Sequence, residues 1–134
     1  MYSMTVSHHF LMAHTLAGAV FGEAQRLHGA TLVVEAEFRG PELDENGVIR
    51  DFAKALGLVK DIVAPFDCRN LDELAEFRGK NTTSEFLAGE IHRRLARHIR
   101  QGALGSGAGT AINNLKVTLR ESPIAWASYD APIR

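Results

Sequence analysis

Two stretches near the N-terminus alternate apolar and polar residues. One face of residues 4–14 collects His8, Phe10, Met12 and His14. One face of residues 29–40 collects Leu32, Val34, Ala36 and Phe38. Because successive side chains of a strand point to opposite faces, and branched residues favour strands, both stretches are predicted to be β-strands. Residues 15–27 are predicted to form a loop between them.

Further along the chain, apolar residues recur at three- and four-residue steps in two segments. This spacing is typical of a helix with one buried face. The first segment follows Asp51, whose carboxylate can cap a helix N-terminus, and ends at Pro65. The second follows Thr83 or Ser84, either of which could be its cap, and ends near Arg100. The sequence therefore predicts two amphipathic helices.

The C-terminal part returns to strand-like patterns. Residues 114–120 alternate again, and residues 124–129 form a shorter apolar stretch after Pro123. The glycine-rich residues 102–109 lack the preceding strand and following lysine of a phosphate loop, so we predict a flexible connection. The order strand, strand, helix, helix, strand, strand predicts a single α+β domain over residues 1–134, with two helices on a four-stranded antiparallel sheet.

Composition and charge exclude some partners. The 134 residues are 46% hydrophobic and 23% charged, as in an ordinary globular domain. The 15 Lys and Arg residues nearly balance the 16 Asp and Glu residues, which leaves a formal charge of −1. Since nucleic-acid binding needs a basic surface, we expect no nucleic-acid partner. The arginines of the second helix are predicted to form a solvated face: Arg93, Arg94, Arg97 and Arg100.

Cysteine content and hydropathy bear on location. The one cysteine, Cys68, cannot form an internal disulfide. The sequence contains no run of roughly 18 apolar residues, the length that a membrane span requires. We therefore expect a cytoplasmic protein without a membrane partner.

Three chemically capable residues lie at predicted strand ends. His14 ends the first strand, His28 begins the second, and Glu121 follows the third. Antiparallel pairing of the first two strands would bring His14 and His28 close together. Any one of these side chains alone would be read as structural, but the three together suggest a site.

Six short blocks in this sequence resemble the 6-pyruvoyl tetrahydropterin synthase family, which includes 6-carboxytetrahydropterin synthases. The blocks are Phe10–His14, Leu27–Gly29, Gly47–Phe52, Asp67, Thr83–Ala88 and Arg120–Ser122. Their order and spacing match the family over nearly the whole chain. The resemblance implies the tunnelling fold (T-fold), with two helices on one side of a four-stranded antiparallel sheet. It also implies a homohexamer in which two trimeric barrels stack, with sites between subunits.

The resemblance further implies a pterin-binding site. Family members hold the pterin through a glutamate, which corresponds to Glu121 here, and Thr83 and Ser84 would line the same pocket. A carboxylate suits this role because it only accepts hydrogen bonds and can accept two in parallel. We therefore expect a pterin-like small molecule as ligand.

The family's zinc site is altered in this chain. Family enzymes hold zinc with three histidines, and His14 and His28 match two of them, but Ala30 stands at the third position. His8 lies six residues before His14, about 20 Å along a strand, which is too far to share an ion. Because three protein ligands are needed to hold a catalytic zinc, we expect no zinc cofactor.

The family's proton-transfer residues are altered as well. Ala24 stands where the family has a catalytic cysteine, and Cys68 replaces the histidine of an Asp–His pair. Asp67 matches the aspartate of that pair, while Asp72 replaces an asparagine. Asp67 and Cys68 are thus the remaining catalytic candidates. Loss of a Lewis acid and of a base near neutral pKa removes both main contributions to the family reaction.

Two functions of different classes follow from this pattern. The first is a pterin-binding protein without synthase activity. The second is a metal-independent lyase or related enzyme acting on a pterin or similar purine-derived heterocycle, through Asp67, Cys68, His14 and His28. A third reading keeps synthase activity, with zinc held by His14, His28 and a group from another subunit.

Overall fold

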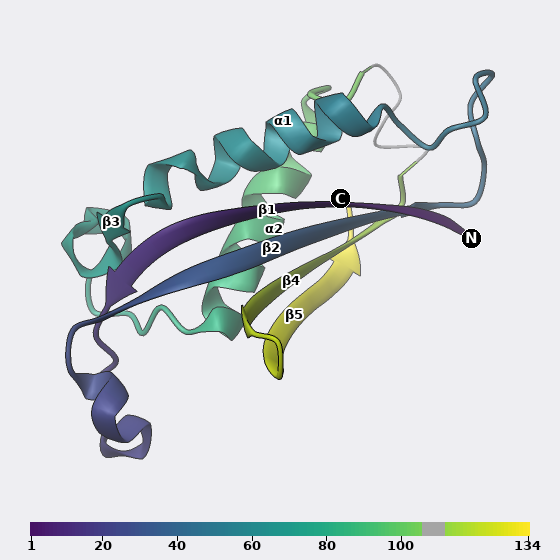
Figure 1. The fold of residues 1–134 in the computed structure, drawn as a ribbon. Coiled ribbons are helices and arrows are strands. Elements are labelled where there is room, and N and C mark those ends of the chain that lie inside the picture. The colour runs from purple at the N-terminus through teal and green to yellow at the C-terminus, as the bar shows by residue number, and fades with distance from the viewer. Residues whose placement is uncertain (106–111) are drawn as a thin grey trace.

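A computed structural model describes residues 1–105 and 112–134, so the predicted glycine-rich connection lies partly outside the described residues. One five-stranded sheet has the order β3-β1-β2-β4-β5 (Figure 1). Its strands are β1 (Tyr2–His14), β2 (His28–Gly40), β3 (Arg69–Asn70), β4 (Asn114–Ser122) and β5 (Ala125–Pro132). β1, β2, β4 and β5 pair antiparallel, as predicted.

The sheet differs from the prediction by one short strand. β3 pairs in parallel with β1 through Met12 and Ala13, which makes the sheet mixed. It is only two residues long, so it leaves no alternation in the sequence. The backbone N–H of Cys68 donates to the carbonyl of Leu11 at 2.6 Å and brings this segment to the edge of β1.

Both predicted helices are confirmed with their caps. α1 (Phe52–Val63) begins after Asp51, whose carboxylate accepts from the N–H of Ala53 at 2.7 Å. α2 (Ser84–Arg100) begins after Thr83, whose hydroxyl accepts from the N–H of Phe86 at 3.1 Å. Each cap is worth about 1 kcal/mol of helix stability.

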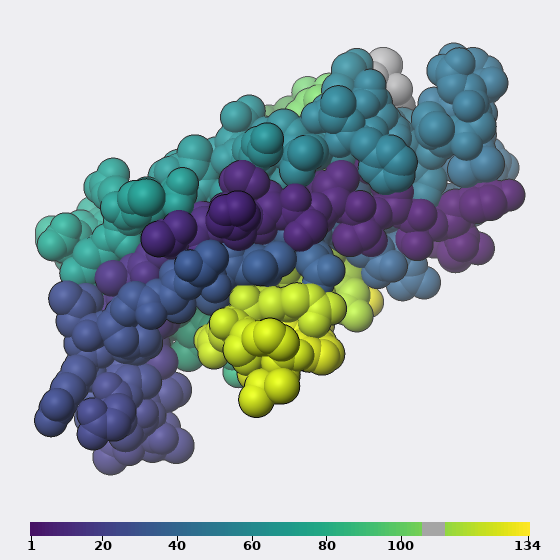
Figure 2. Space-filling view, in the orientation of Figure 1, coloured from purple at the N-terminus to yellow at the C-terminus, as the bar shows by residue number. Residues whose placement is uncertain are grey.

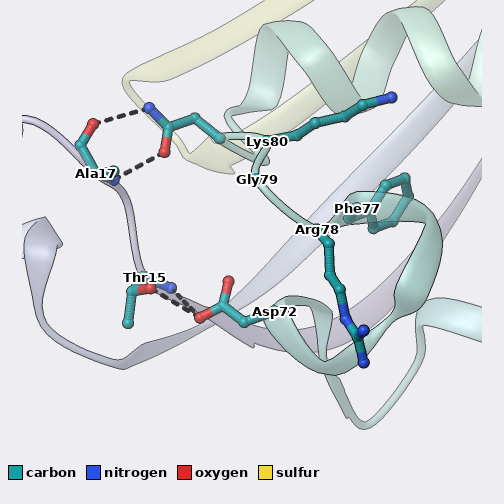
Figure 3. A pocket seen from close by; sticks show the side chains of 8 residues that line it. Thr15, Ala17, Asp72, Phe77, Arg78, Gly79 and Lys80 are labelled. Carbon is teal, nitrogen blue, oxygen red and sulfur yellow. Dashed lines mark hydrogen bonds between the residues drawn. The ribbon is translucent and has the colours of Figure 1, made fainter.

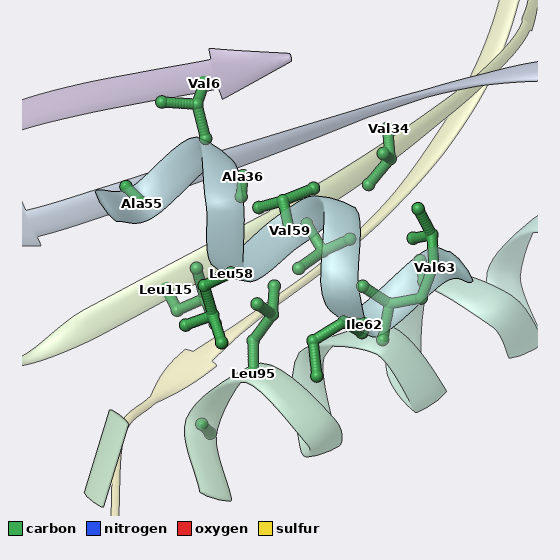
Figure 4. Packing of buried hydrophobic residues seen from close by; sticks show 14 of the residues in the cluster. Val6, Val34, Ala36, Ala55, Leu58, Val59, Ile62, Val63, Leu95 and Leu115 are labelled. Carbon is green, nitrogen blue, oxygen red and sulfur yellow. The ribbon is translucent and has the colours of Figure 1, made fainter. Parts of the chain in front are cut away.

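The core lies between the two helices and one face of the sheet (Figure 4). The alternating face of β2 is fully buried and packs under α1 and α2: Leu32, Val34, Ala36 and Phe38. Val59 and Val63 of α1 and Leu95 of α2 fill the same cluster. Since side chains alternate along a strand, the intervening residues of each strand form the opposite, more polar face.

The connection from β1 to β2 contains a short 3₁₀ helix, Ala19–Gln25, where a loop was predicted. This connection and the turn between β4 and β5 both protrude from the body of the molecule (Figure 2). Because β1 and β4 end where β2 begins, the two protrusions lie toward one end of the sheet. No helix in residues 1–105 and 112–134 has the length and apolar character that a membrane crossing requires.

The prediction that Arg94 faces solvent is wrong. Its guanidinium carbon lies 4.8 Å from the ring centre of Phe66, and its Nε donates to Glu90 at 2.9 Å. It also forms an ion pair with Glu76 at 3.6 Å. Arg94 therefore attaches the irregular segment after α1 to the middle of α2.

We expect R94A to lower the free energy of unfolding by about 2 kcal/mol, because it removes packing on Phe66 as well as charge. Urea denaturation followed by circular dichroism measures this. R97A is the matched control: Arg97 is exposed on the same helix, and its loss should cost less than about 0.5 kcal/mol. Equal effects of the two variants would show that Arg94 has no special structural role.

Candidate functional site

One end of the sheet gathers most of the predicted site residues. His14 is the last residue of β1, His28 is the first residue of β2, and Cα pairing places them opposite each other. Glu121 lies near the end of β4, and Ser84 begins α2. The antiparallel order of β1, β2 and β4 therefore brings these residues from distant parts of the sequence to one end of the domain.

The two histidines are in direct ring contact. Their ring centroids are 4.6 Å apart at an interplanar angle of 62°. The Nδ1 of His28 donates to the backbone carbonyl of Arg26 at 2.8 Å, which leaves its Nε2 as the atom with a free lone pair. The Nδ1 of His14 lies 2.8 Å from the hydroxyl of Thr82, a residue that is 1% exposed. Both rings are thus held in fixed orientations.

Burial lowers the pKa of the His14 imidazole, and the neighbouring His28 lowers it further. Asp72, the hydrogen bond with Thr82 and the charge of Glu121 act in the opposite direction without cancelling the effect. Since the pKa of a free histidine is about 6.5, His14 is neutral at neutral pH. A neutral imidazole in this position can accept a proton.

The lowered pKa of His14 predicts a pH-dependent stability. Below about pH 6.5 the unfolded chain binds a proton that folded His14 resists. The free energy of unfolding should therefore fall as the pH drops from about 7.5 to about 5.5. H14Q should flatten this slope in urea titrations across that range.

The matched control for that titration is H9Q, because His9 is exposed on the same strand. H9Q removes one cause of the lowered pKa of His8, but it leaves in place every group that shifts the pKa of His14. The slope should therefore stay close to that of the parent protein. A slope that is equally steep in H14Q and in the parent would mean that His14 does not carry the pH dependence.

The histidine pair offers two ligand nitrogens to a zinc ion, and no third ligand lies beside it on β2. Ala30, two residues after His28 on the same side of β2, presents only a methyl group. Across the part of the chain that the structure describes, no three His, Cys, Asp or Glu side chains lie close enough to hold one metal ion. Two imidazoles are one fewer than the three protein ligands of a catalytic zinc. This donor set is consistent with the expected lack of zinc, which stays a prediction.

Glu121 has a defined hydrogen-bond partner and adjoins open space. The Ser84 hydroxyl donates to its Oε1 at 2.5 Å. A cavity of about 210 Å³ lies beside this pair, lined also by Glu85 and Trp126. A second cavity, of about 320 Å³, meets Glu121 from the side of Thr31 and Val33. One carboxylate oxygen is thus oriented by Ser84, and the group remains accessible to a ligand.

Thr83 has a different role from Ser84. Its hydroxyl caps α2 by accepting from Phe86 and is not among the groups lining the cavity beside Glu121. The residues on either side make the long-range contacts, Thr82 with His14 and Ser84 with Glu121. The start of α2 therefore links the histidine pair to the glutamate.

The segment just before α2 is fastened to the end of β1 (Figure 3). The side chain of Asn81 bonds both the N–H and the carbonyl of Ala17, at 2.8 and 2.9 Å. The carboxylate of Asp72 accepts from the N–H and the hydroxyl of Thr15, at 2.9 and 2.8 Å. These bonds fix the backbone directly after His14, and their residues line a cavity of about 350 Å³.

Asp67 and Cys68 form a separate pair. The Cys68 thiol lies 3.7 Å from Asp67 Oδ1, which also accepts from the N–H of Leu11 at 3.0 Å. Cys68 is exposed and adopts a left-handed backbone conformation with φ 58°. Leu11 precedes His14 by three residues, about 10 Å along the strand. The four candidate acid–base residues therefore form two separate pairs. His14 and His28 meet at the end of β1, whereas Asp67 and Cys68 lie beside Leu11, earlier in the same strand.

Sequence reasoning missed Thr82 and the bond between Asp72 and Thr15. Thr82 contacts a residue 68 positions away, which local periodicity cannot reveal. The polar run from Asn81 to Ser84 directly before a helix was the available signal. Such runs often cap helices, and only Thr83 does so here.

Comparison with known sequences gives one consistent family. A family model described as 6-pyruvoyl tetrahydropterin synthase matches residues 3–132. A curated protein of Archaeoglobus fulgidus, provisionally named 6-carboxy-5,6,7,8-tetrahydropterin synthase, is 33% identical over 122 residues. That match covers 91% of this chain and 90% of the relative.

Solved structures share the fold. The 6-pyruvoyl tetrahydropterin synthase of Caenorhabditis elegans matches with a TM-score of 0.80 at 25% identity, over 97% of this chain and 95% of that one. The enzyme of the same name from Plasmodium vivax matches with a TM-score of 0.78 at 20% identity, over 98% of both chains. At that lower identity the likeness shows the fold alone.

Proposed function

Because this chain belongs to the 6-pyruvoyl tetrahydropterin synthase family, we propose that it binds a pterin-like small molecule through Glu121 without catalysing the synthase reaction. The observation that carries the binding is the Ser84–Glu121 hydrogen bond of 2.5 Å beside an open cavity. An ionised carboxylate can accept two parallel bonds, and a pterin offers an amino group and a ring N–H as neighbouring donors.

The proposed lack of synthase activity rests on the donor set. His14 and His28 are in contact, but Ala30 offers no third ligand nitrogen. Family chemistry moves protons beside groups that a Lewis acid polarises, and two imidazoles without a bound ion cannot supply that polarisation. Ala24 and Cys68 remove the thiolate and the imidazole that would carry the protons.

Elemental analysis combined with a turnover assay tests this proposal. Protein purified without chelator should contain far less than one zinc per chain, and should leave dihydroneopterin triphosphate unconverted. Calorimetric titration of the same sample with neopterin should show micromolar binding. Stoichiometric zinc together with turnover would contradict the proposal. The protein would then be a synthase whose zinc is held by His14, His28 and a third ligand from another subunit.

A metal-independent enzyme is the second candidate function. It is favoured by the neutral His14, which Thr82 orients and which touches His28. Asp67 and Cys68 would then act at a separate point about 10 Å along β1. Turnover by metal-free protein would support this candidate, and unchanged turnover in C68A would remove the thiol from it.

The family relationship also supports a proposed location and oligomeric state. We place it in the cytoplasm as a homohexamer built from two trimers, with each site completed by a neighbouring subunit. The open edge of β5 offers a surface for such assembly, since Tyr129 of this strand is about half exposed in one chain. Sedimentation equilibrium gives the assembly mass directly.

A further inference from the structure

Trp126 is a large aromatic side chain placed next to Glu121. It lies in β5 opposite Arg120 of β4, the residue directly before Glu121. It lines the same cavity of about 210 Å³ as Ser84 and Glu121. It is 53% exposed in the single chain, which leaves much of its surface available for contact.

Trp126 is also held in place. The guanidinium carbon of Arg120 lies 4.3 Å from its ring centre, within the range of a cation–π contact. Arg120 is itself fixed, because its Nε donates to Glu35 Oε1 at 2.5 Å. The chain Glu35–Arg120–Trp126 therefore orders the indole before any ligand binds, which reduces the entropy lost on binding.

We propose that Trp126 forms the aromatic wall of the Glu121 site and selects planar heteroaromatic rings as its ligands. Glu121 alone would accept any neighbouring pair of N–H donors, including an aliphatic guanidinium. An ordered indole beside it adds stacking or edge contact that only a flat ring can match. This inference rests on the proposed function, since it assigns a specificity residue to the same site.

The test uses the fact that Trp126 is the only tryptophan of the chain. On titration with neopterin, Trp126 emission should be quenched saturably, with the same Kd that calorimetry gives. W126A should weaken neopterin binding roughly 5- to 100-fold, the range for loss of one ring–aromatic stack. W126F, which keeps a ring, should stay within about threefold of the parent.

Matched variants separate this inference from the proposed function. I124A removes an exposed apolar side chain from the same β4–β5 hairpin, outside the cavity, and should bind as the parent does. If W126A binds neopterin like the parent and Trp126 emission stays constant at saturation, this inference is overturned while the proposed function stands. If E121Q binds like the parent, the proposed function fails. If W126A alters the assembly mass, its Kd is set aside. The inference then stands if the parent shows saturable Trp126 quenching and W126F keeps its affinity, and it is overturned if the emission stays constant.

Discussion

E121Q is expected to weaken pterin binding roughly 10- to 150-fold. Each hydrogen bond to a charged acceptor contributes roughly 1.5–3 kcal/mol, and the substitution replaces one accepting oxygen of Glu121 by an NH₂ group that faces the ligand's own donors. The amide oxygen can still accept from the Ser84 hydroxyl, so the local fold should be kept. Calorimetric titration with neopterin measures the change.

E73Q is the control for E121Q. Glu73 is an exposed carboxylate away from the cavities beside Glu121, and its substitution removes the same charge. It should leave the neopterin Kd within about twofold, because Glu73 lines neither cavity and water and salt screen an exposed charge. Equal affinity in E121Q and E73Q would show that Glu121 does not anchor the ligand.

A30H is expected to create a zinc site that the parent lacks. Ala30 lies two residues after His28, so a histidine there would face the same side of β2 as His28. His14 is already in ring contact with His28 and is oriented by Thr82, and such outer partners typically raise metal affinity 10- to 100-fold. We expect about one tightly bound zinc per chain in A30H.

T31H is the matched control for A30H. It adds a histidine one position further along β2, where the side chain points to the opposite face. T31H should bind no more zinc than the parent after dialysis against trace zinc, measured by elemental analysis. Stoichiometric zinc in the parent itself would contradict the account, because the site would then be complete without a third histidine on β2.

Local patterns were sufficient to predict the main elements. Alternation located β1 and β2, since the buried positions Phe10, Leu32 and Phe38 recur at even spacing. Asp51 marked the start of α1 because its carboxylate can satisfy free N–H groups of the first turn. These signals lie within a few residues of the structure that they specify.

Long-range contacts could not be predicted in the same way. β3 forms because the Asp67–Cys68 turn meets Leu11, 56 positions away from Asp67. Arg94 is held against Phe66, which lies in an irregular segment without periodicity. The site shows the same division: antiparallel pairing predicted the contact of His14 with His28, whereas nothing local connected His14 with Thr82.

The central claim is that this protein binds a pterin-like ligand at Glu121 without needing a metal ion. Calorimetric titration of chelator-treated, metal-free protein with neopterin tests it most directly. The account predicts micromolar binding that added zinc leaves unchanged. The reason is that the Ser84 hydroxyl, and not a metal ion, orients the carboxylate of Glu121. Binding that is absent from the metal-free protein and returns with stoichiometric zinc would contradict it.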